Sequence, residues 1–171
     1  GRGLLVRSAA AASAVPVAEF TLAAILFANK DVFGARERDR RPAPDHPWFE
    51  RGPSIGNAAK RVGLIGASHV GRLVIGLLAP FDVDVVVADP YLSPADAAAL
   101  GVEVVDLDTL VATADVVSVH APELPETRHL LDARRLASMR DGATVINTAR
   151  GSLVDTEALT AELRTGRISA V

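Results

Sequence analysis

The 171-residue chain contains no cysteine, and aromatic residues make up only 4% of it. Without cysteine it can form no disulfide, no thiolate-ligated metal site and no thiolate nucleophile. The formal net charge of -3 gives no electrostatic reason to expect nucleic acid or an acidic membrane as a partner. Because 49% of the residues are hydrophobic but few are aromatic, the core must be built from Ala, Val, Leu and Ile. That composition suits helices packed on a buried sheet.

Long apolar runs are also scarce, and we expect none to approach the roughly 20 residues that span a bilayer. Residues 1–18 carry Arg2 and Arg7 without an acid, which superficially resembles a targeting peptide. However, Arg7 and Ser8 interrupt the apolar stretch, and the chain begins with Gly rather than Met. We therefore expect a cytoplasmic protein. We also expect this sequence to start in the middle of a longer one.

The first 60 residues divide into two parts by composition. Residues 1–30 are expected to form an N-terminal segment with a largely buried helix at 16–29, where Pro16 suits the first helical position. Residues 31–60 carry Pro42, Pro44, Pro47 and Pro53 among mixed charges. We expect an extended loop or arm there, because so many prolines oppose regular structure.

From residue 61 onward, short apolar runs alternate with amphipathic segments, which predicts a core over 61–171. The expected strands are 61–66, 83–89, 102–105, 115–122, 143–149 and 167–171. The expected helices are 70–80, 107–114, 132–139 and 155–166, with Asp106, Asp132 and Asp155 or Thr156 as caps and Gly166 as a stop. The pattern predicts an α/β fold with a Rossmann-type, doubly wound parallel sheet. Ligands of such sheets bind beyond the carboxyl ends of the strands.

Two of these strand ends suggest a dinucleotide site. The stretch GLIGASHVG places Gly66 and Gly71 at the first and third positions of a Gly-x-Gly-x-x-Gly loop, with Ser68 at the second. Such a loop before a helix offers free N–H groups to a pyrophosphate. Asp89 follows Gly66 by 23 residues, about the spacing of an acid that binds a ribose hydroxyl and disfavours a 2′-phosphate. Alternatively, Asp89 only begins a turn at Pro90.

The other two strand ends carry His120, followed by Ala121 and Pro122, and Arg150 within INTARGSLVD. His120 could act as a base, pack in the core or line the adenine pocket, and packing is the default for a lone histidine. His46 and His129 lie in turn-like contexts and are expected to be structural or at the surface. Arg150 could hold a carboxylate through two parallel N–H donors, or it could simply lie at the surface.

Five segments in this order resemble the D-isomer-specific 2-hydroxyacid dehydrogenases, which include phosphoglycerate and glyoxylate/hydroxypyruvate dehydrogenases. The segments are VAEFTLAAIL, VGLIGASHVGRLV, VVVADPY, ADVVSVHAPELPETRHLL and MRDGATVINTARGSLVDTEAL. The resemblance covers almost the whole chain except residues 31–60. It implies one NAD-binding domain over residues 1–171, truncated at both ends relative to a two-domain subunit and with the substrate domain essentially absent.

The resemblance also implies the roles of individual residues. Arg150 matches the catalytic arginine, while the glutamate and histidine that act with it would lie beyond Val171. The implied cofactor is NAD, with no metal, and the implied partners are a small 2-keto or 2-hydroxy acid and a second subunit in a homodimer. The implied NAD contacts are Gly66, Ala67, Ser68, His69, Val70, Gly71, Asp89, Pro90, His120, Ala121, Pro122, Thr127, Thr148, Ala149 and Arg150. The departure at Ser68 leaves the phosphate affinity open.

Two other classes share parts of this pattern. An NAD-sensing protein resembling the C-terminal-binding corepressors would carry the same fold and loop. A methyltransferase would use Gly66 and Asp89 for S-adenosylmethionine, but it gives no role to the segment around Arg150.

Overall fold

A single parallel sheet organises the computed structural model, which describes residues 10–39 and 56–171. Its six strands follow the order β3-β2-β1-β4-β5-β6, and every neighbouring pair is parallel. The strands are β1 (Lys60–Ile65), β2 (Val83–Ala88), β3 (Glu103–Val104), β4 (Val116–Val119), β5 (Thr144–Asn147) and β6 (Ser169–Ala170). The order reverses between β1 and β4, which is the topological switch of a doubly wound sheet. The predicted fold class is therefore confirmed.

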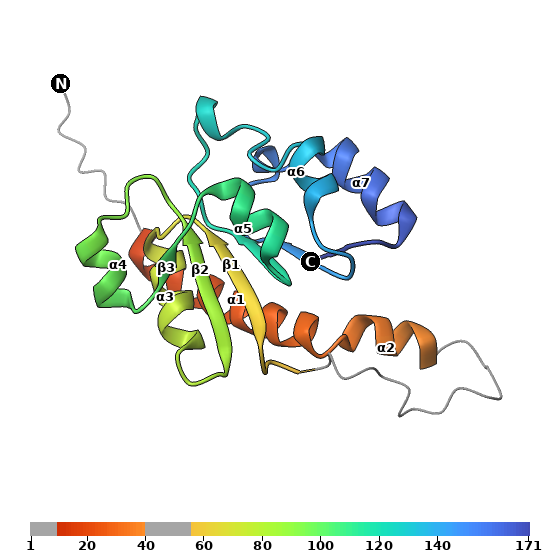
Figure 1. Cartoon of the computed structure of the whole chain (residues 1–171), viewed down its shortest axis with the longest axis horizontal. Coiled ribbons are helices and arrows are strands. Elements are labelled where there is room, and N and C mark those ends of the chain that lie inside the picture. The colour runs from red at the N-terminus through yellow and green to blue at the C-terminus, as the bar shows by residue number, and fades with distance from the viewer. Residues whose placement is uncertain (1–9, 40–55) are drawn as a thin grey trace, which may run out of the picture.

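Helices cover both faces of this sheet (Figure 1). They are α1 (Ala10–Asn29), α2 (Val32–Asp39), α3 (His69–Leu78), α4 (Pro94–Leu100), α5 (Leu107–Thr113), α6 (Ala133–Ser138) and α7 (Thr156–Thr165), with short 3-10 turns η1 (Pro125–Thr127) and η2 (Gly151–Leu153). One buried cluster joins α1, α3 and α4 to the sheet, and a second joins α5 and α6 to the opposite face.

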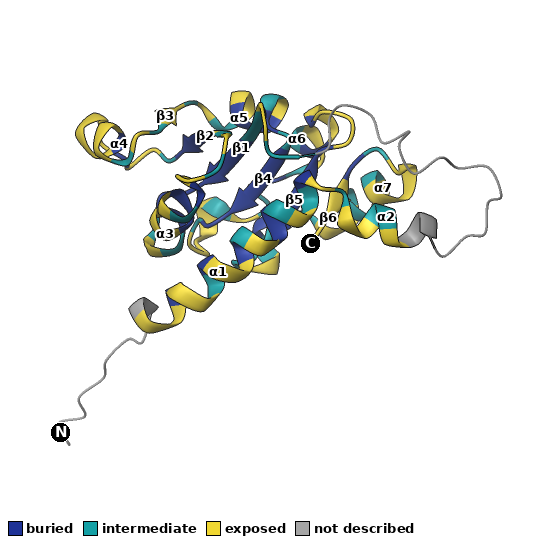
Figure 2. Ribbon diagram, turned by 90° about the horizontal axis from the view of Figure 1, so that it is seen from below, coloured by how far each residue is buried: buried dark blue, intermediate teal, exposed yellow. Residues whose placement is uncertain are grey.

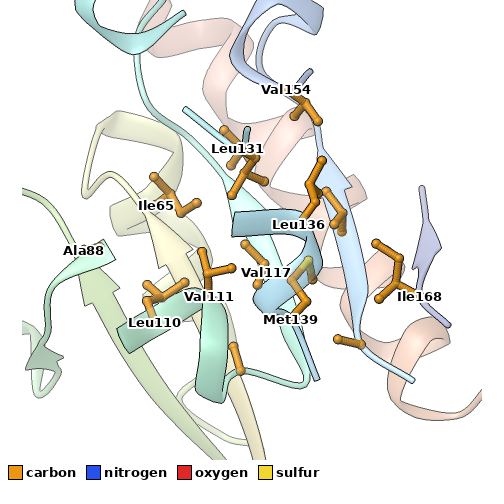
Figure 3. Packing of buried hydrophobic residues seen from close by; sticks show 14 of the residues in the cluster. Ile65, Ala88, Leu110, Val111, Val117, Leu131, Leu136, Met139, Val154 and Ile168 are labelled. Atoms are coloured by element: carbon orange, nitrogen blue, oxygen red, sulfur yellow. The ribbon is translucent and has the colours of Figure 1, made fainter. Parts of the chain in front are cut away.

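Neighbouring residues along a strand enter opposite cores, and this explains the continuous apolar runs in the sequence. In β4, Val116 belongs to the cluster under α1 and α3, whereas Val117 belongs to the cluster under α5 and α6. Figure 3 shows Val117 surrounded by Val111 of α5 and Met139 beside α6. Because successive side chains of a strand point to opposite faces, a sheet covered on both sides needs apolar residues throughout.

Helix α1 departs from its prediction in two ways. It begins at Ala10, so Pro16 lies inside the helix rather than at its first position. The alanine-rich run before Pro16 has the highest intrinsic helix propensity, which accounts for the earlier start. The helix is also less buried than predicted, because Val15, Phe20 and Phe27 are 48%, 58% and 44% exposed. Figure 2 shows buried residues on its inner side and exposed residues on its outer side.

The length of α1 also corrects the expectation about membrane spans. By length and composition alone, residues 12–29 could cross a bilayer, since they form an apolar helical stretch of 18 residues. One such helix is weak evidence, because a core helix of a soluble protein passes the same test. Here the inner residues Ala18, Ala24 and Ile25 are buried against α3 and the sheet.

Residues 31–60 are not the continuous loop that the sequence suggested. Their first part forms α2, which continues beyond α1 away from the sheet (Figure 1). The ring of Phe33 meets the ring of Phe27 edge-on, with 5.8 Å between centroids, and this contact joins the two helices. The four prolines all follow α2. The predicted loop therefore began too early, because residues 32–39 contain no proline and form a helix. Residues 40–55, including His46, lie outside the described residues, as do residues 1–9.

The predicted helix caps are confirmed, and one short helix was missed. The side chains of Asp106, Asp132 and Asp155 each accept a backbone N–H in the first turn of α5, α6 and α7. Gly166 ends α7 in the left-handed conformation. The missed helix is α4, whose cap Ser93 accepts the N–H of Asp96. Its sequence signal, a serine followed by proline and alanines, was taken as part of a turn.

Candidate functional site

Four strands end in line at one edge of the sheet. Ile65, at the end of β1, pairs with Ala88 of β2 and with Val119 of β4. Val119 in turn pairs with Asn147 of β5. The segments that follow these four residues therefore start side by side. These segments contain every predicted site residue except Thr127, which lies further along the loop after β4.

Gly66 opens the loop after β1 in a conformation that suits only glycine. Its φ is +97°, and its N–H donates to the carbonyl of Ala88, 3.0 Å away. A Cβ on Gly66 would lie 3.0 Å from the backbone nitrogen of Ala121. The loop after β1 and the loop after β4 thus approach each other through their backbones. This close approach falls at the switch point, where a doubly wound sheet binds its ligand.

Gly71 and Ser68 show which glycines the loop requires. A Cβ on Gly71 would lie 2.2 Å from the carbonyl oxygen of Gly66, so the first turn of α3 can sit against the loop only with glycine there. Ser68 instead has φ -66° and ψ -175°, which any residue adopts. It caps α3, and its hydroxyl accepts the N–H of Gly71 at 3.5 Å. The missing second glycine is thus replaced by an N-cap without backbone strain.

The remaining loop residues lie at the start of α3. His69 is the exposed first residue of the helix, and Val70 is half-buried beside it. Arg72, which the sequence analysis missed, donates from Nε to the carbonyl of Ala67 at 3.1 Å and lies 3.5 Å from the carboxylate of Asp96. The guanidinium therefore ties the loop to α4. An arginine directly after the third glycine was the available signal.

Asp89 follows β2 and supports the loop directly. One carboxylate oxygen accepts the N–H of Ala67 at 2.8 Å, and the other accepts the N–H of Tyr91 at 2.8 Å. The second bond holds the turn that begins at Pro90. Asp89 therefore organises the turn that was one of the two alternatives from the sequence, and it also lies against the glycine loop. An ionised carboxylate has about four acceptor positions, so further acceptor capacity remains for a hydroxyl.

His120 is a packing residue in this structure. Its side chain is buried, and its Nε2 lies 3.0 Å from the hydroxyl of the equally buried Ser118. Burial lowers the pKa of His120 from 6.5 to about 4, so the imidazole is neutral at pH 7. Its backbone N–H continues the sheet by donating to the carbonyl of Ile65. A buried, neutral ring after β4 agrees with the expectation that His120 packs in the core. It does not agree with a role as a general base.

Thr127 closes the loop after β4 upon itself. Its hydroxyl oxygen lies 2.7 Å from the carbonyl oxygen of Pro122 and accepts the N–H of Leu124 at 2.8 Å. The loop is further fixed where Glu123 accepts the hydroxyl of Ser152 at 2.6 Å. Thr127 and Pro122 thus fix the shape of the loop after β4. His129 lies in the turn that follows, with φ +51°, as expected of a structural position.

Arg150 stands at the end of β5 on a turn built by Asn147. The amide of Asn147 donates to the carbonyl of Arg150 at 2.8 Å, and its oxygen accepts the N–H of Ala149 at 3.1 Å. The guanidinium is exposed, with NH1 donating to the carbonyl of Ala149 at 3.0 Å. Most of its five N–H donors therefore remain available for an anion.

A second missed residue, Thr21, connects α1 to this edge. Its hydroxyl is fully buried and lies 3.0 Å from the hydroxyl of Thr148, directly after β5. The same hydroxyl donates to the carbonyl of Val17 at 2.8 Å. A polar residue on the inner side of an apolar helix was the signal, but its partner lies 127 residues away in the chain.

Strand order, switch point and glycine loop together define a dinucleotide-binding domain of the Rossmann type. The residues fit such a group, because Gly66 and Gly71 allow the loop after β1, the segment after β4 and the start of α3 to approach closely where a Cβ would meet backbone atoms. A family model described as "D-isomer specific 2-hydroxyacid dehydrogenase, NAD binding domain" matches residues 22–171. The chain belongs to this family of dehydrogenases.

Individual relatives agree with this assignment. D-3-phosphoglycerate dehydrogenase of Mycobacterium bovis is 40% identical over 99% of this chain, which covers 31% of that protein. The NAD complex of a D-isomer-specific 2-hydroxyacid dehydrogenase from Lactobacillus delbrueckii ssp. bulgaricus is 31% identical, with a TM-score of 0.77, over 98% of this chain and 49% of that one. The chain thus spans about a third to a half of these relatives.

Coenzyme choice differs among proteins of this shape. An acyclic imino acid reductase in complex with NADPH and D-Arg is 29% identical, with a TM-score of 0.73, over 90% of this chain and 48% of that one. The fold alone therefore does not decide between NAD and NADP. Nothing in the fold or in these comparisons supports the corepressor alternative.

Proposed function

We propose that this chain forms the coenzyme-binding part of an enzyme that transfers hydride between NAD(H) and a D-2-hydroxy acid or its 2-keto acid. The observation that carries the proposal is the alignment of four strand ends at one edge. It places the glycine loop beside Asp89 and, two strands away, the exposed Arg150. The relatives named above, a D-3-phosphoglycerate dehydrogenase among them, support this class of substrate.

The loop after β1 would hold the pyrophosphate of NAD. The first N–H groups of α3 and the positive end of its dipole favour an anion there. The proposed contacts of the whole dinucleotide are Gly66, Ala67, Ser68, His69, Val70, Gly71, Asp89, Pro90, His120, Ala121, Pro122, Thr127, Thr148, Ala149 and Arg150. When bound, the nicotinamide would supply the hydride or accept it, and the protein would orient it.

Asp89 would favour NAD over NADP. Its carboxylate already accepts the N–H groups of Ala67 and Tyr91, and the remaining acceptor positions suit the hydroxyls of a ribose. A 2′-phosphate would instead meet a negative charge at short range, which is unfavourable.

Arg150 would hold the substrate carboxylate and polarise the carbonyl that accepts hydride. Its planar fork keeps its charge at any working pH. The glutamate and histidine that pass the proton in this family are proposed to lie outside these 171 residues, in the parent subunit. We therefore expect this chain to bind NAD(H) weakly and to turn over no substrate, while the parent acts in the cytoplasm as a homodimer.

Titration of the 171-residue chain with NADH, followed by nucleotide fluorescence, tests the proposal. Binding should weaken in Asp89→Asn, which keeps one acceptor oxygen but removes the charge, and the preference for NADH over NADPH should shrink. Asp82→Asn is the matched control, because Asp82 is exposed and precedes β2 at the opposite edge. Absence of NADH binding, a preference for S-adenosylmethionine, or steady NADH oxidation with hydroxypyruvate by this chain alone would contradict it.

A further inference from the structure

Arg72 is a charged residue beside the glycine loop to which the proposed function assigns no role. It lies on α3 directly after Gly71, and its side chain is 43% exposed. Its Nε donates to the carbonyl of Ala67 at 3.1 Å, which leaves the N–H donors of its two outer nitrogens for other partners. One of these nitrogens lies 3.5 Å from a carboxylate oxygen of Asp96 on α4. The guanidinium is thus held by the loop through one nitrogen and by α4 through another.

Arg72 and Asp89 both bind the backbone of Ala67. The carboxylate of Asp89 accepts the N–H of Ala67 at 2.8 Å, and Arg72 donates to the carbonyl of the same residue at 3.1 Å. Because the N and O atoms of one residue are at most about 4 Å apart along its bonds, the Nε of Arg72 lies within about 10 Å of that carboxylate oxygen. This separation is comparable to the Debye length of about 8 Å at physiological salt. The charge of Arg72 therefore acts on a group that is bound at Asp89.

The two segments that start beside Asp89 carry no second lysine or arginine. Residues 66–78 contain Arg72 alone, and residues 89–101 contain neither residue type. A dinucleotide-binding fold accommodates a ribose 2′-phosphate with a nearby arginine, whose planar fork suits phosphate oxygens. Within these two segments only Arg72 could provide such a fork, and it already pairs with Asp96.

Asp96 is held in place by the cap of α4. The hydroxyl of Ser93 accepts the N–H of Asp96 at 3.1 Å, and the carbonyl of Ser93 accepts the N–H of Ala97 at 2.9 Å. Ala97 is buried in the cluster that joins α4 to α3 and the sheet. The carboxylate of Asp96 is therefore presented to Arg72 from a first turn that is capped and anchored in the core.

We propose that Asp96 is a second specificity-determining residue, which acts by holding the guanidinium of Arg72 on α4 and away from a 2′-phosphate. This rests on the proposed function, which puts the adenosine ribose at Asp89. The carboxylate of Asp89 repels the phosphate directly, whereas Asp96 withholds the cation that would attract it. Because an exposed ion pair is weak, Asp96 adjusts a coenzyme preference that Asp89 sets.

The test measures the dissociation constants of NADH and NADPH by fluorescence titration of the 171-residue chain. The ratio of the NADPH constant to the NADH constant isolates the 2′-phosphate, because effects on the shared parts of the two dinucleotides cancel. Asp96→Asn should lower this ratio by about two- to fivefold, the effect of one exposed ion pair. In the Arg72→Gln background, Asp96→Asn should leave the ratio unchanged, because there is no guanidinium to release.

Asp84→Asn is the matched control. Asp84 pairs with Arg61 at 2.6 Å and is 49% exposed, close to the 52% of Asp96, but it lies near the start of β2 at the opposite edge of the sheet. Its removal changes the net charge by the same amount, so the ratio of the two dissociation constants should stay at the wild-type value.

The outcomes separate this inference from the function on which it rests. If wild type binds neither dinucleotide, the proposed function fails and the inference with it. If wild type binds NADH but Asp96→Asn keeps the wild-type ratio, only the inference is overturned. An equal fall in the ratio with and without the guanidinium would also overturn it, because Asp96 would then act on the phosphate by its own charge. Should Arg72→Gln fail to fold, Arg72→Met, which keeps an unbranched side chain, takes its place.

Discussion

Ser68 stands where dinucleotide loops commonly carry glycine, and its backbone angles explain why it can. Its φ of -66° needs no glycine, whereas Gly66 has φ +97° and Gly71 leaves no room for a Cβ. Two of the three fingerprint glycines are therefore fixed by this backbone, and the middle position is free to carry a cap. The sequence alone could not predict which of the three positions can vary, because this depends on the surroundings of each Cα in the fold.

Ser68→Gly should accordingly change little. Loss of the cap costs only a few tenths of a kcal/mol when glycine replaces serine. NADH affinity should change by less than about tenfold, which corresponds to about 1.4 kcal/mol. Fluorescence titration and thermal unfolding measure the two effects. Complete loss of NADH binding in this variant would contradict the role assigned to Ser68.

The buried His120 makes a prediction about acid stability. Its folded pKa of about 4 lies below the ordinary 6.5, so between these values the unfolded chain holds a proton that the folded chain does not. The contribution of His120 to the free energy of unfolding should therefore be greatest above pH 6.5. It should decrease as the pH drops towards 4, by at most about 3 kcal/mol.

Urea unfolding at pH 7 and pH 5 measures this effect through the change in midpoint. His120→Gln should lose stability at pH 7 but show a smaller further loss at pH 5 than wild type. His69→Gln, which replaces an exposed histidine on the same edge, should keep the wild-type pH dependence. An equal acid loss in wild type and His120→Gln would show that other groups cause it.

Among the elements, α3 carries the sharpest contrast, because its two glycines have opposite surroundings. A Cβ at Gly71 would lie 2.2 Å from the carbonyl oxygen of Gly66, whereas one at Gly76 meets nothing within 4 Å. Gly71→Ala should therefore displace the loop, lower the melting temperature and abolish NADH binding. Gly76→Ala should stabilise the helix by up to about 1 kcal/mol, because alanine restricts the unfolded chain more than glycine.

Both variants are read by thermal unfolding together with NADH titration. Both replace glycine by alanine in α3. A stability change of opposite sign in the two variants therefore isolates the effect of the contact between Gly71 and the loop. If Gly71→Ala were as stable as wild type and still bound NADH, the close approach of α3 to the loop would not be required.

Elements that are specified locally were predicted well. Helices α5, α6 and α7 start at aspartates that cap them, and the buried strands show as apolar runs. Three elements were not predicted well. Helix α4 was missed although its cap Ser93 is a local signal, whereas the limits of α1 and α2 depend on context beyond a few residues. The start of α1 depends on an alanine run that outweighs Pro16, and α2 is supported by a contact between Phe27 and Phe33.

The same division holds for the site. The four strand ends could be placed at one edge from the order of elements alone, since parallel strands share their carboxyl edge. The link from Thr21 to Thr148 could not be predicted, because it joins residues that are far apart in sequence and share no motif.

For the whole molecule, the outer side of α1 and α2 is the surface that points to assembly. Val15, Phe20, Phe27 and Phe33 are each 44% or more exposed along these two helices. Exposed apolar patches of this kind mark contact sites in soluble proteins. This surface is the one we assign to the proposed homodimer.

Phe20→Ser should shift the chain towards monomer without unfolding it, since the ring of Phe20 is 58% exposed and contributes little to the core. Sedimentation velocity over a range of concentrations measures the shift. Leu163→Ser on α7 is the control, because Leu163 is 39% exposed on another helix and should leave association unchanged. Equal association of wild type and Phe20→Ser would remove this surface from the proposed interface.

The two hydrogen bonds of Asp89 also constrain how such a chain could evolve. Under the role proposed for Asp89, a lineage that exchanges NAD for NADP has to remove the negative charge at this position. The same step removes at least one of the two carboxylate oxygens that accept the N–H groups of Ala67 and Tyr91. The first substitution therefore weakens the loop that both coenzymes share before any gain for NADP appears. A switch of coenzyme should require at least two coupled changes, one for the charge and one that supplies a new acceptor.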